Sequence, residues 1–323
     1  MSLTKRRNHW KPLQYDWAFD AYVQQNAMHW VPDEIPLSED VRDWQKKMTL
    51  EEKNLITHIF RFFTQGDVEV ADNYMTRYMQ VFRPPEVQMM LAAFANIEGV
   101  HIHAYSLLLD TLGLPEIEYS KFMDYKAMRD KHDLFEKFSI DDPREIAKTL
   151  AGFGAFVEGV QLFASFAILI NFTRFNRMKG MGKVIEWSMR DENLHSESII
   201  KLFRTYIKEN RKIWDDELKR EIYDIAEKMV EAEDAFVDLA FEMGPVQGLT
   251  KEDVKTYVRY MADKRLIALG MKGIFKQKTH PLPWIDTLAG ATKTNFFESR
   301  ETGYSKGVTT GSWDSAFEEV FGK

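Results

Sequence analysis

The stretch that decides the fold is ANIEGVHIHAYSLLLD, residues 95–110. It places Glu98 three residues before His101, and Tyr105 four residues after that histidine, inside an otherwise apolar run. Residues three, four and seven positions apart share one face of an α-helix, so a carboxylate, an imidazole and a phenol line one stripe. His103 would point away from this stripe. The stretch therefore predicts a buried helix whose polar stripe needs a partner.

The Glu-x-x-His motif recurs further along the chain as Glu192 and His195, in ENLHSES. One such motif is weak evidence for a metal site, so the surroundings matter more than the spacing. Asp67 follows the aromatic run IFRFFTQG, and Glu158 lies within the apolar run GFGAFVEGVQLFASFAILINF, residues 152–172. Burying an unpaired carboxylate in such surroundings costs on the order of several kcal/mol. A compensating cation is therefore expected.

Helical periodicity dominates the chain, and alternating strand patterns are rare. A capping box from Thr49 to Glu52 and a stop at Pro84 and Pro85 bound one long helix. Asp142 caps a further helix that has Pro143 in its first turn, and Thr250 caps another. We expect helices over residues 49–83, 86–112, 142–172, 184–209, 214–243 and 251–271. The predicted fold is all-α, with residues 1–275 as one helical domain and residues 276–323 as a mobile tail.

Four of these helices each offer an inward acid, and two of them add a histidine. Bundles that hold two metal ions use this arrangement, with one acid from each of two helices and Glu-x-x-His from the other two. Carboxylate and imidazole ligands suit iron or manganese. The sequence therefore predicts a dimetal site within a four-helix core.

Composition excludes several classes of protein. A net charge of −7 gives no basic footprint for nucleic acid, and the chain has no cysteine for a thiolate ligand or a catalytic thiol. The apolar run at residues 152–172 is long enough to cross a membrane, but it contains Glu158 and Gln161. We therefore expect a central bundle helix there and no membrane span. The charged N-terminus lacks an apolar signal segment, which favours the cytoplasm.

The stretches HWVPDEIPLSEDVRDW, ENLHSES and TNFFESRETGYSKG resemble the small, radical-generating subunit of class I ribonucleotide reductase, a ferritin-like family. The resemblance covers nearly the whole chain. It implies Asp67, Glu98 and His101 as ligands of one metal ion. For the other ion it implies Glu158, Glu192 and His195, with Glu98 and Glu192 leaning toward bridging positions. Two iron ions are the first expectation, and two manganese ions or a mixed pair use the same ligand types.

The same resemblance assigns redox roles to four residues. Tyr105 matches the tyrosine that the dimetal centre oxidises to a stable radical. Trp30, with Asp191 as its hydrogen-bonding partner toward His101, matches the route by which the radical leaves. Tyr304 matches the tail tyrosine that relays the radical across the subunit interface.

The resemblance also implies partners. The radical would start the reduction of ribonucleotides to deoxyribonucleotides in a separate catalytic large subunit, which the tail binds. That reaction uses thiols, and this chain has none, so it cannot complete the reaction alone. A homodimer is expected as well.

Two other functions fit part of the pattern. A dimetal oxidase or hydroxylase would keep the six ligands but would need neither Trp30 nor a tail with Tyr304. A ferritin-like metal store or a helical scaffold would need no Tyr105.

Overall fold

The computed structural model describes residues 2–288 of the 323. Their secondary structure is helical apart from turns and one isolated bridge between Val246 and Leu249. The predicted all-α class is confirmed. Tyr304 lies outside the described residues. The chain divides into a compact unit, Met1–Leu282, and a second unit, Pro283–Lys323.

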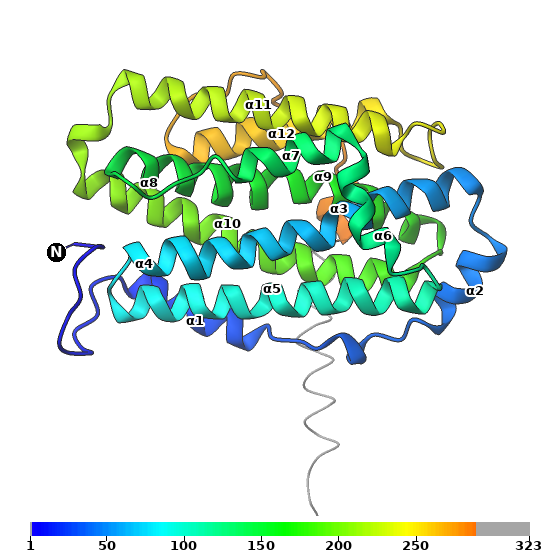
Figure 1. Ribbon diagram of the computed structural model, residues 1–323, viewed down its shortest axis with the longest axis horizontal. Coiled ribbons are helices and arrows are strands. Elements are labelled where there is room, and N and C mark those ends of the chain that lie inside the picture. Colours follow the sequence, from blue (N-terminus) through cyan, green and yellow to red (C-terminus); the bar gives the residue numbers. More distant parts are fainter. Residues whose placement is uncertain (1, 289–323) are drawn as a thin grey trace, which may run out of the picture. The chain divides into compact units, whose positions relative to one another are not determined.

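The α-helices of the described chain are labelled in Figure 1. The longer helices are α1 (Asp16–Ala27), α2 (Ser38–Lys46), α3 (Leu50–Asp72), α5 (Pro85–Leu112), α7 (Lys126–Phe135), α8 (Pro143–Thr149), α9 (Leu162–Ile170), α10 (Lys179–Glu209), α11 (Asp216–Ala240) and α12 (Lys251–Leu269). Two π-helical segments interrupt them, η2 (Asn73–Tyr78) and η4 (Leu150–Gln161). The short elements are η1 (Pro32–Glu34), α4 (Met79–Val81), α6 (Ile117–Ser120), η3 (Lys121–Asp124), η5 (Asn171–Phe175) and η6 (Arg211–Ile213).

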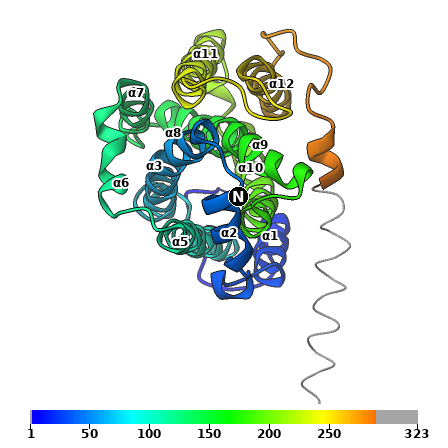
Figure 2. The same cartoon turned by 90° about the vertical axis from the view of Figure 1, so that its right-hand side faces the viewer.

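Four long helical segments form the centre of the bundle. Helix α3 packs on α5, α5 on α10, α10 on the segment η4–α9, and α9 on α3. Figure 2 shows these helices nearly end-on, around a common centre. Helix α1 covers α5 and α10, while α11 and α12 cover η4 on the opposite side (Figures 1 and 2). The centre of the bundle is therefore enclosed by a second layer of helices.

The predicted helix starts are confirmed at three caps. Thr49 accepts a hydrogen bond from the Glu52 amide at 3.3 Å, and Glu52 accepts one from the Thr49 amide at 3.1 Å. Asp142 accepts from two amides of the first turn of α8, and Thr250 accepts from the Asp253 amide. These side chains satisfy amides that have no partner within the helix.

Helix α10 begins at Lys179, earlier than predicted, although RMKGMGK contains two glycines. Asp40 and Asp43 of α2 explain the difference. Asp43 accepts a hydrogen bond from the Met178 amide at 3.0 Å, and Asp40 accepts from the Gly180 amide at 2.9 Å. Carboxylates from another helix thus cap a start that local sequence does not reveal.

The apolar run predicted to be a core helix is buried. Pro143–Phe175 is the one helix in the described chain that is long and apolar enough to cross a membrane, and its most apolar window is wholly buried in the bundle. The prediction of a central bundle helix is confirmed. Its middle, η4, has the wider π-helical turn, in which the amide bonds to the carbonyl five residues back. The sequence pattern predicted an ordinary α-helix there and also at η2.

Candidate dimetal centre

The six predicted ligands converge at the centre of the bundle. At most 1% of the surface of each residue is exposed. Asp67 comes from α3, Glu158 from η4, Glu98 and His101 from α5, and Glu192 and His195 from α10. Their ligand atoms form two groups, Asp67–Glu98–His101 and Glu98–Glu158–Glu192–His195, in each of which one ligand atom per residue lies within 4.8 Å of the others.

Both imidazoles direct the Nδ1 atom at the carboxylates. His101 Nδ1 lies 3.3 Å from Glu98 Oε2, 3.2 Å from Glu192 Oε1 and 3.9 Å from Asp67 Oδ2. His195 Nδ1 lies 2.9 Å from Glu98 Oε1, 3.4 Å from Glu192 Oε2 and 3.8 Å from Glu158 Oε1. Glu98 and Glu192 thus each direct one oxygen at each histidine. Asp67 belongs to the His101 half of the site and Glu158 to the His195 half.

The residues fit a pair of metal ions because their inward atoms lack ordinary partners. Among the described residues, no hydrogen-bond partner is found for either carboxylate oxygen of Asp67, Glu98 and Glu192, for Glu158 Oε2, or for Nδ1 of the two histidines. Buried polar atoms are normally paired, and leaving one unpaired costs about 1–3 kcal/mol, more for charged groups. Carboxylate oxygens and neutral imidazole nitrogens are ligands for hard or borderline divalent cations. The donor set therefore matches what a dimetal centre needs.

Electrostatics at the centre are those of crowded, buried acids. Burial raises the pKa of Asp67 well above its usual value, and the charge of Glu98 adds to the effect. Burial and the charge of Glu192 raise the pKa of Glu158 in the same direction. For His195, burial lowers the pKa, but the neighbouring carboxylates outweigh it and raise the pKa to about 10. Without a cation, the site therefore draws protons onto its histidines and onto some of its acids.

The outer nitrogens of the histidines contact a buried polar network. His101 Nε2 lies 3.3 Å from Asp191 Oδ2, and the same oxygen accepts a hydrogen bond from Trp30 Nε1 at 2.8 Å. The ring centroids of Trp30 and His101 are 6.0 Å apart. Burial raises the pKa of Asp191, but the hydrogen bond from His101 and the charge of Arg190 outweigh it, so the net shift is downward. Asp191 therefore serves as a buried anion that joins the predicted tryptophan to the predicted ligand.

Tyr105 lies in an aromatic enclosure beside the centre. Its surface is fully buried, its ring stacks on Phe63 at 4.8 Å, and Phe60 packs at 5.9 Å. The His101 ring is 6.3 Å away. Burial and the charge of Asp67 raise the pKa of Tyr105 well above its usual value, so the phenol stays protonated. Phe166 packs on Phe63 at 5.2 Å and extends the enclosure.

Two polar neighbours of the centre were not predicted. Gln25 of α1 lies between the halves of the network, with Oε1 3.1 Å from His195 Nε2 and Nε2 3.3 Å from Asp191 Oδ1. Tyr74 of η2 donates a hydrogen bond to Glu158 Oε1 at 2.5 Å. A glutamine in the polar end QQN of α1 gives no sequence signal, whereas Tyr74, seven residues after Asp67, shares its helical stripe and could have been found.

Glu69, two residues after Asp67, lies away from the centre on another face of α3. Its Oε1 atom is 3.3 Å from His132 Nε2 and accepts a hydrogen bond from Gln65. Glu69, His132 and Glu136 form a separate, partly exposed group.

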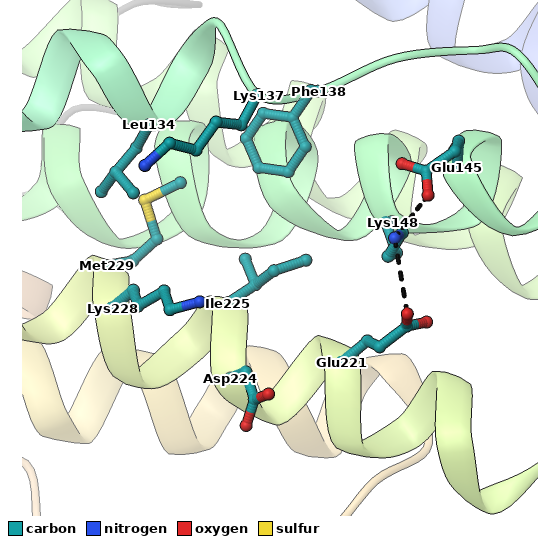
Figure 3. A pocket seen from close by; sticks show the side chains of 10 residues that line it. All are labelled: Leu134, Lys137, Phe138, Glu145, Lys148, Glu221, Asp224, Ile225, Lys228 and Met229. Atoms are coloured by element: carbon teal, nitrogen blue, oxygen red, sulfur yellow. Dashed lines mark ion pairs between the residues drawn. The ribbon is translucent and has the colours of Figure 1, made fainter.

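A surface pocket lies between α7, α8 and α11 and has a volume of about 230 Å³ (Figure 3). Lys148 bridges Glu145 at 2.5 Å and Glu221 at 3.6 Å within it. None of the ten lining residues belongs to the buried centre. The pocket is therefore separate from that centre.

Known proteins are similar to this chain in sequence and in fold. The family described as "Ribonucleotide reductase, small chain" matches residues 7–281. A probable ribonucleoside-diphosphate reductase small subunit of invertebrate iridescent virus 6 is 41% identical, over 97% of this chain and 98% of its own length. The ribonucleoside-diphosphate reductase subunit beta of Chlamydia pneumoniae is 30% identical, over 91% and 88%.

Solved structures agree in fold. A ribonucleotide reductase R2 subunit from Clostridium botulinum superposes with a TM-score of 0.80 at 23% identity, covering 88% of this chain and 91% of that one. The helical bundle is thus of the ferritin-like type, as predicted. Because the family matches most of the chain and its curated relatives align almost end to end, this protein belongs to the small-subunit family of ribonucleoside-diphosphate reductases, which are oxidoreductases.

Proposed function

We propose that the buried centre holds two metal ions and that Tyr105 carries the radical which this small subunit delivers to its catalytic partner. The observation that carries the proposal is the convergence of six buried ligands whose inward atoms have no other partner. Asp67 and His101 would serve one ion, Glu158 and His195 the other. Glu98 and Glu192 would bridge them, since each has one oxygen toward each histidine.

The bound metal pair would supply the redox chemistry that a protein side chain lacks, namely the removal of one electron from a phenol. Iron is our first expectation, with manganese or a mixed pair as alternatives, because all three suit these ligands. One solved structure of the same fold is titled as a dimanganese(II) protein, from Streptococcus sanguinis.

The protein around Tyr105 protects a radical by excluding reactants. A phenol that gives up an electron to the metal pair would also give up its proton to a neighbouring base and become a neutral radical, which a reductant that reached it would quench. Tyr105 is fully buried, and Phe60 and Phe63 cover its ring. Its hydroxyl group has no hydrogen-bond partner at normal distance among the described residues.

The route away from the centre would run from His101 through Asp191 to Trp30. With Nδ1 turned to the metal, the other nitrogen of His101 carries the proton and donates to Asp191. Asp191 then accepts from Trp30 Nε1 as well, so one carboxylate fixes both rings. Proton movement along these hydrogen bonds can accompany electron movement between the rings. Tyr304, outside the described residues, would complete the route.

The partner is the large catalytic subunit with which small subunits of this family work, and these small subunits are dimers. We propose that residues 276–323 form the tail that binds the large subunit, and that this chain also dimerises. We further propose a cytoplasmic location, which is supported by the burial of the one long apolar helix in the described chain.

The test combines metal analysis with electron paramagnetic resonance on iron-loaded, oxygen-treated protein. We expect two metal ions per chain and a tyrosyl signal that Tyr105→Phe abolishes. Tyr78→Phe is the matched control, because Tyr78 is equally buried and donates to the carbonyl oxygen of Thr149 at 3.1 Å. Two ions per chain with no radical, whether loaded with iron or with manganese, would contradict the role of Tyr105.

A further inference from the structure

A second tyrosine, Tyr74, touches the centre and has no part in the route described above. Its side chain is fully buried, and its hydroxyl group donates to Glu158 Oε1 at 2.5 Å. Burial, together with the charge of Glu158, raises the pKa of Tyr74 well above its usual value, so the phenol is a donor. The hydrogen bond joins two residues that are 84 positions apart in the sequence and both buried in the core.

The two phenols at the centre have different surroundings. Tyr105 lies near His101, with its ring among phenylalanines and its hydroxyl group unpaired. The Tyr74 ring lies 6.0 Å from the His195 ring, in the other half of the site, and its hydroxyl group is engaged by a proposed ligand. The Tyr105 phenol therefore has no partner at normal hydrogen-bond distance among the described residues, whereas the Tyr74 phenol donates to a carboxylate.

The backbone brings Tyr74 and Glu158 together through two unusual segments. Tyr74 lies in η2 and Glu158 in η4, and both segments are π-helical. A π-turn shifts the following side chains around the helix axis, and such turns are frequent at functional sites. The Tyr74 ring is held edge-on by Phe94 at 5.9 Å and Tyr78 at 5.7 Å. The position of its hydroxyl oxygen is thus set by packing.

The hydrogen bond makes the two oxygens of Glu158 unequal. Oε1 accepts from Tyr74, whereas Oε2 has no hydrogen-bond partner among the described residues. A carboxylate oxygen that accepts a short hydrogen bond shares its lone-pair density with that proton, which makes it a weaker donor to a metal ion. Oε2 remains the better ligand of the two.

We propose that Tyr74 is a positioning residue that makes Glu158 a one-oxygen ligand of the metal ion beside His195. It would do so by fixing the rotation of the Glu158 carboxylate, with Oε1, which lies 3.8 Å from His195 Nδ1, engaged by the phenol and Oε2 left without another partner among the described residues. The proposal rests on the proposed function, because it takes Glu158 to be a ligand. Under this proposal the two halves of the centre differ, because the carboxylate of Glu158, in the His195 half, is held in place by a phenol.

The experiment compares full-length wild type, Tyr74→Phe and Tyr78→Phe during titration with Co²⁺ alone. Each variant loses one buried hydroxyl group, so thermal unfolding without metal is expected to show a similar lowering of Tm. Stoichiometry comes from metal analysis, and affinity from competition with a chelator. The visible absorption of bound Co²⁺ reports the number and geometry of its ligands.

For Tyr74→Phe we expect two bound ions, a changed Co²⁺ absorption spectrum and a loss of affinity for one ion of about 10–100-fold, the usual effect of removing a partner of a metal ligand. Tyr78→Phe should match wild type in spectrum and affinity. A wild-type spectrum and affinity in Tyr74→Phe would overturn the proposal. Failure of wild-type protein to bind two ions would instead overturn the proposed ligand set.

Discussion

Two regions of this protein bury charge in opposite ways. Outside the centre, Lys131 of α7 and Glu233 of α11 form a fully buried ion pair, with Nζ 2.6 Å from Oε2. The ammonium group also lies 4.3 Å from the Phe62 ring and 4.2 Å from the Phe236 ring. Burial lowers the pKa of Lys131 and raises that of Glu233, but each group has the other as partner.

The proposed dimetal centre contains four acids and two histidines with no lysine or arginine among them. The ion pair is complete within the chain, whereas the proposed centre would be complete only with cations from outside. The difference teaches that a buried charge is structural where the chain supplies its counter-charge and functional where it does not. Four predictions test this distinction.

The largest effect is expected from breaking the ion pair between Lys131 and Glu233. Lys131→Met leaves Glu233 buried without its partner, and this should lower the free energy of unfolding by about 3–5 kcal/mol. Urea unfolding of metal-free protein measures the change. The double variant Lys131→Met/Glu233→Leu is the control and should recover most of the loss. A single variant as stable as wild type would show that the pair is not structural.

Metal binding at the proposed centre should raise the free energy of unfolding by slightly less than loss of the Lys131–Glu233 ion pair lowers it. An ion that binds only the folded protein adds about 2.7 kcal/mol when its free concentration is 100 times its Kd. We therefore expect Fe²⁺ or Mn²⁺ to raise Tm and a chelator to reverse the rise. Glu98→Gln, which removes a carboxylate shared by both halves, should abolish the shift. A shift that persists in Glu98→Gln would place the stabilising ion elsewhere.

The affinity for metal should rise with pH. The pKa of His195 in the metal-free protein is raised to about 10, so at pH 7 this imidazole is protonated. A metal ion needs the lone pair on Nδ1, hence binding releases the proton. Between pH 6 and pH 9 the affinity should increase by about tenfold per pH unit for each proton released. Calorimetry in buffers of different ionisation enthalpy measures the release, and no release at pH 7 would contradict the prediction.

The smallest effect is expected from neutralising Asp67, one acid of the proposed dimetal centre. Burial and Glu98 raise the pKa of Asp67, so its charged form is disfavoured in the metal-free protein. Asp67→Asn should therefore leave the free energy of unfolding unchanged or raise it by less than about 2 kcal/mol. Urea unfolding without metal tests this. A loss as large as that of Lys131→Met would mean that the centre is held together by its own charges.

Sequence reasoning reached the fold and the cluster because both depend on periodic patterns. Acids in apolar surroundings and a Glu-x-x-His pair on each of two helices are visible as spacings of three and four residues. The caps at Thr49, Asp142 and Thr250 were also predictable, because each side chain bonds an amide two or three residues further along the chain. Patterns of this kind follow from single helices and need no knowledge of how helices pack.

The unpredicted features depend on contacts between distant segments. Gln25 belongs to the outer helix α1, and its role is visible only when that helix lies over α10. The start of α10 is fixed by Asp40 and Asp43 from another helix. The π-turns that bring Tyr74 onto Glu158 have no simple sequence signature. Such contacts arise from packing, so a local pattern cannot reveal them.

The most direct test of the central claim is anomalous diffraction from crystals of protein loaded with iron or manganese. The account predicts two metal peaks in each chain, one between Asp67 and His101 and one between Glu158 and His195, with Glu98 and Glu192 touching both. A single peak, or peaks only at partly exposed sites such as Glu69 and His132, would contradict it.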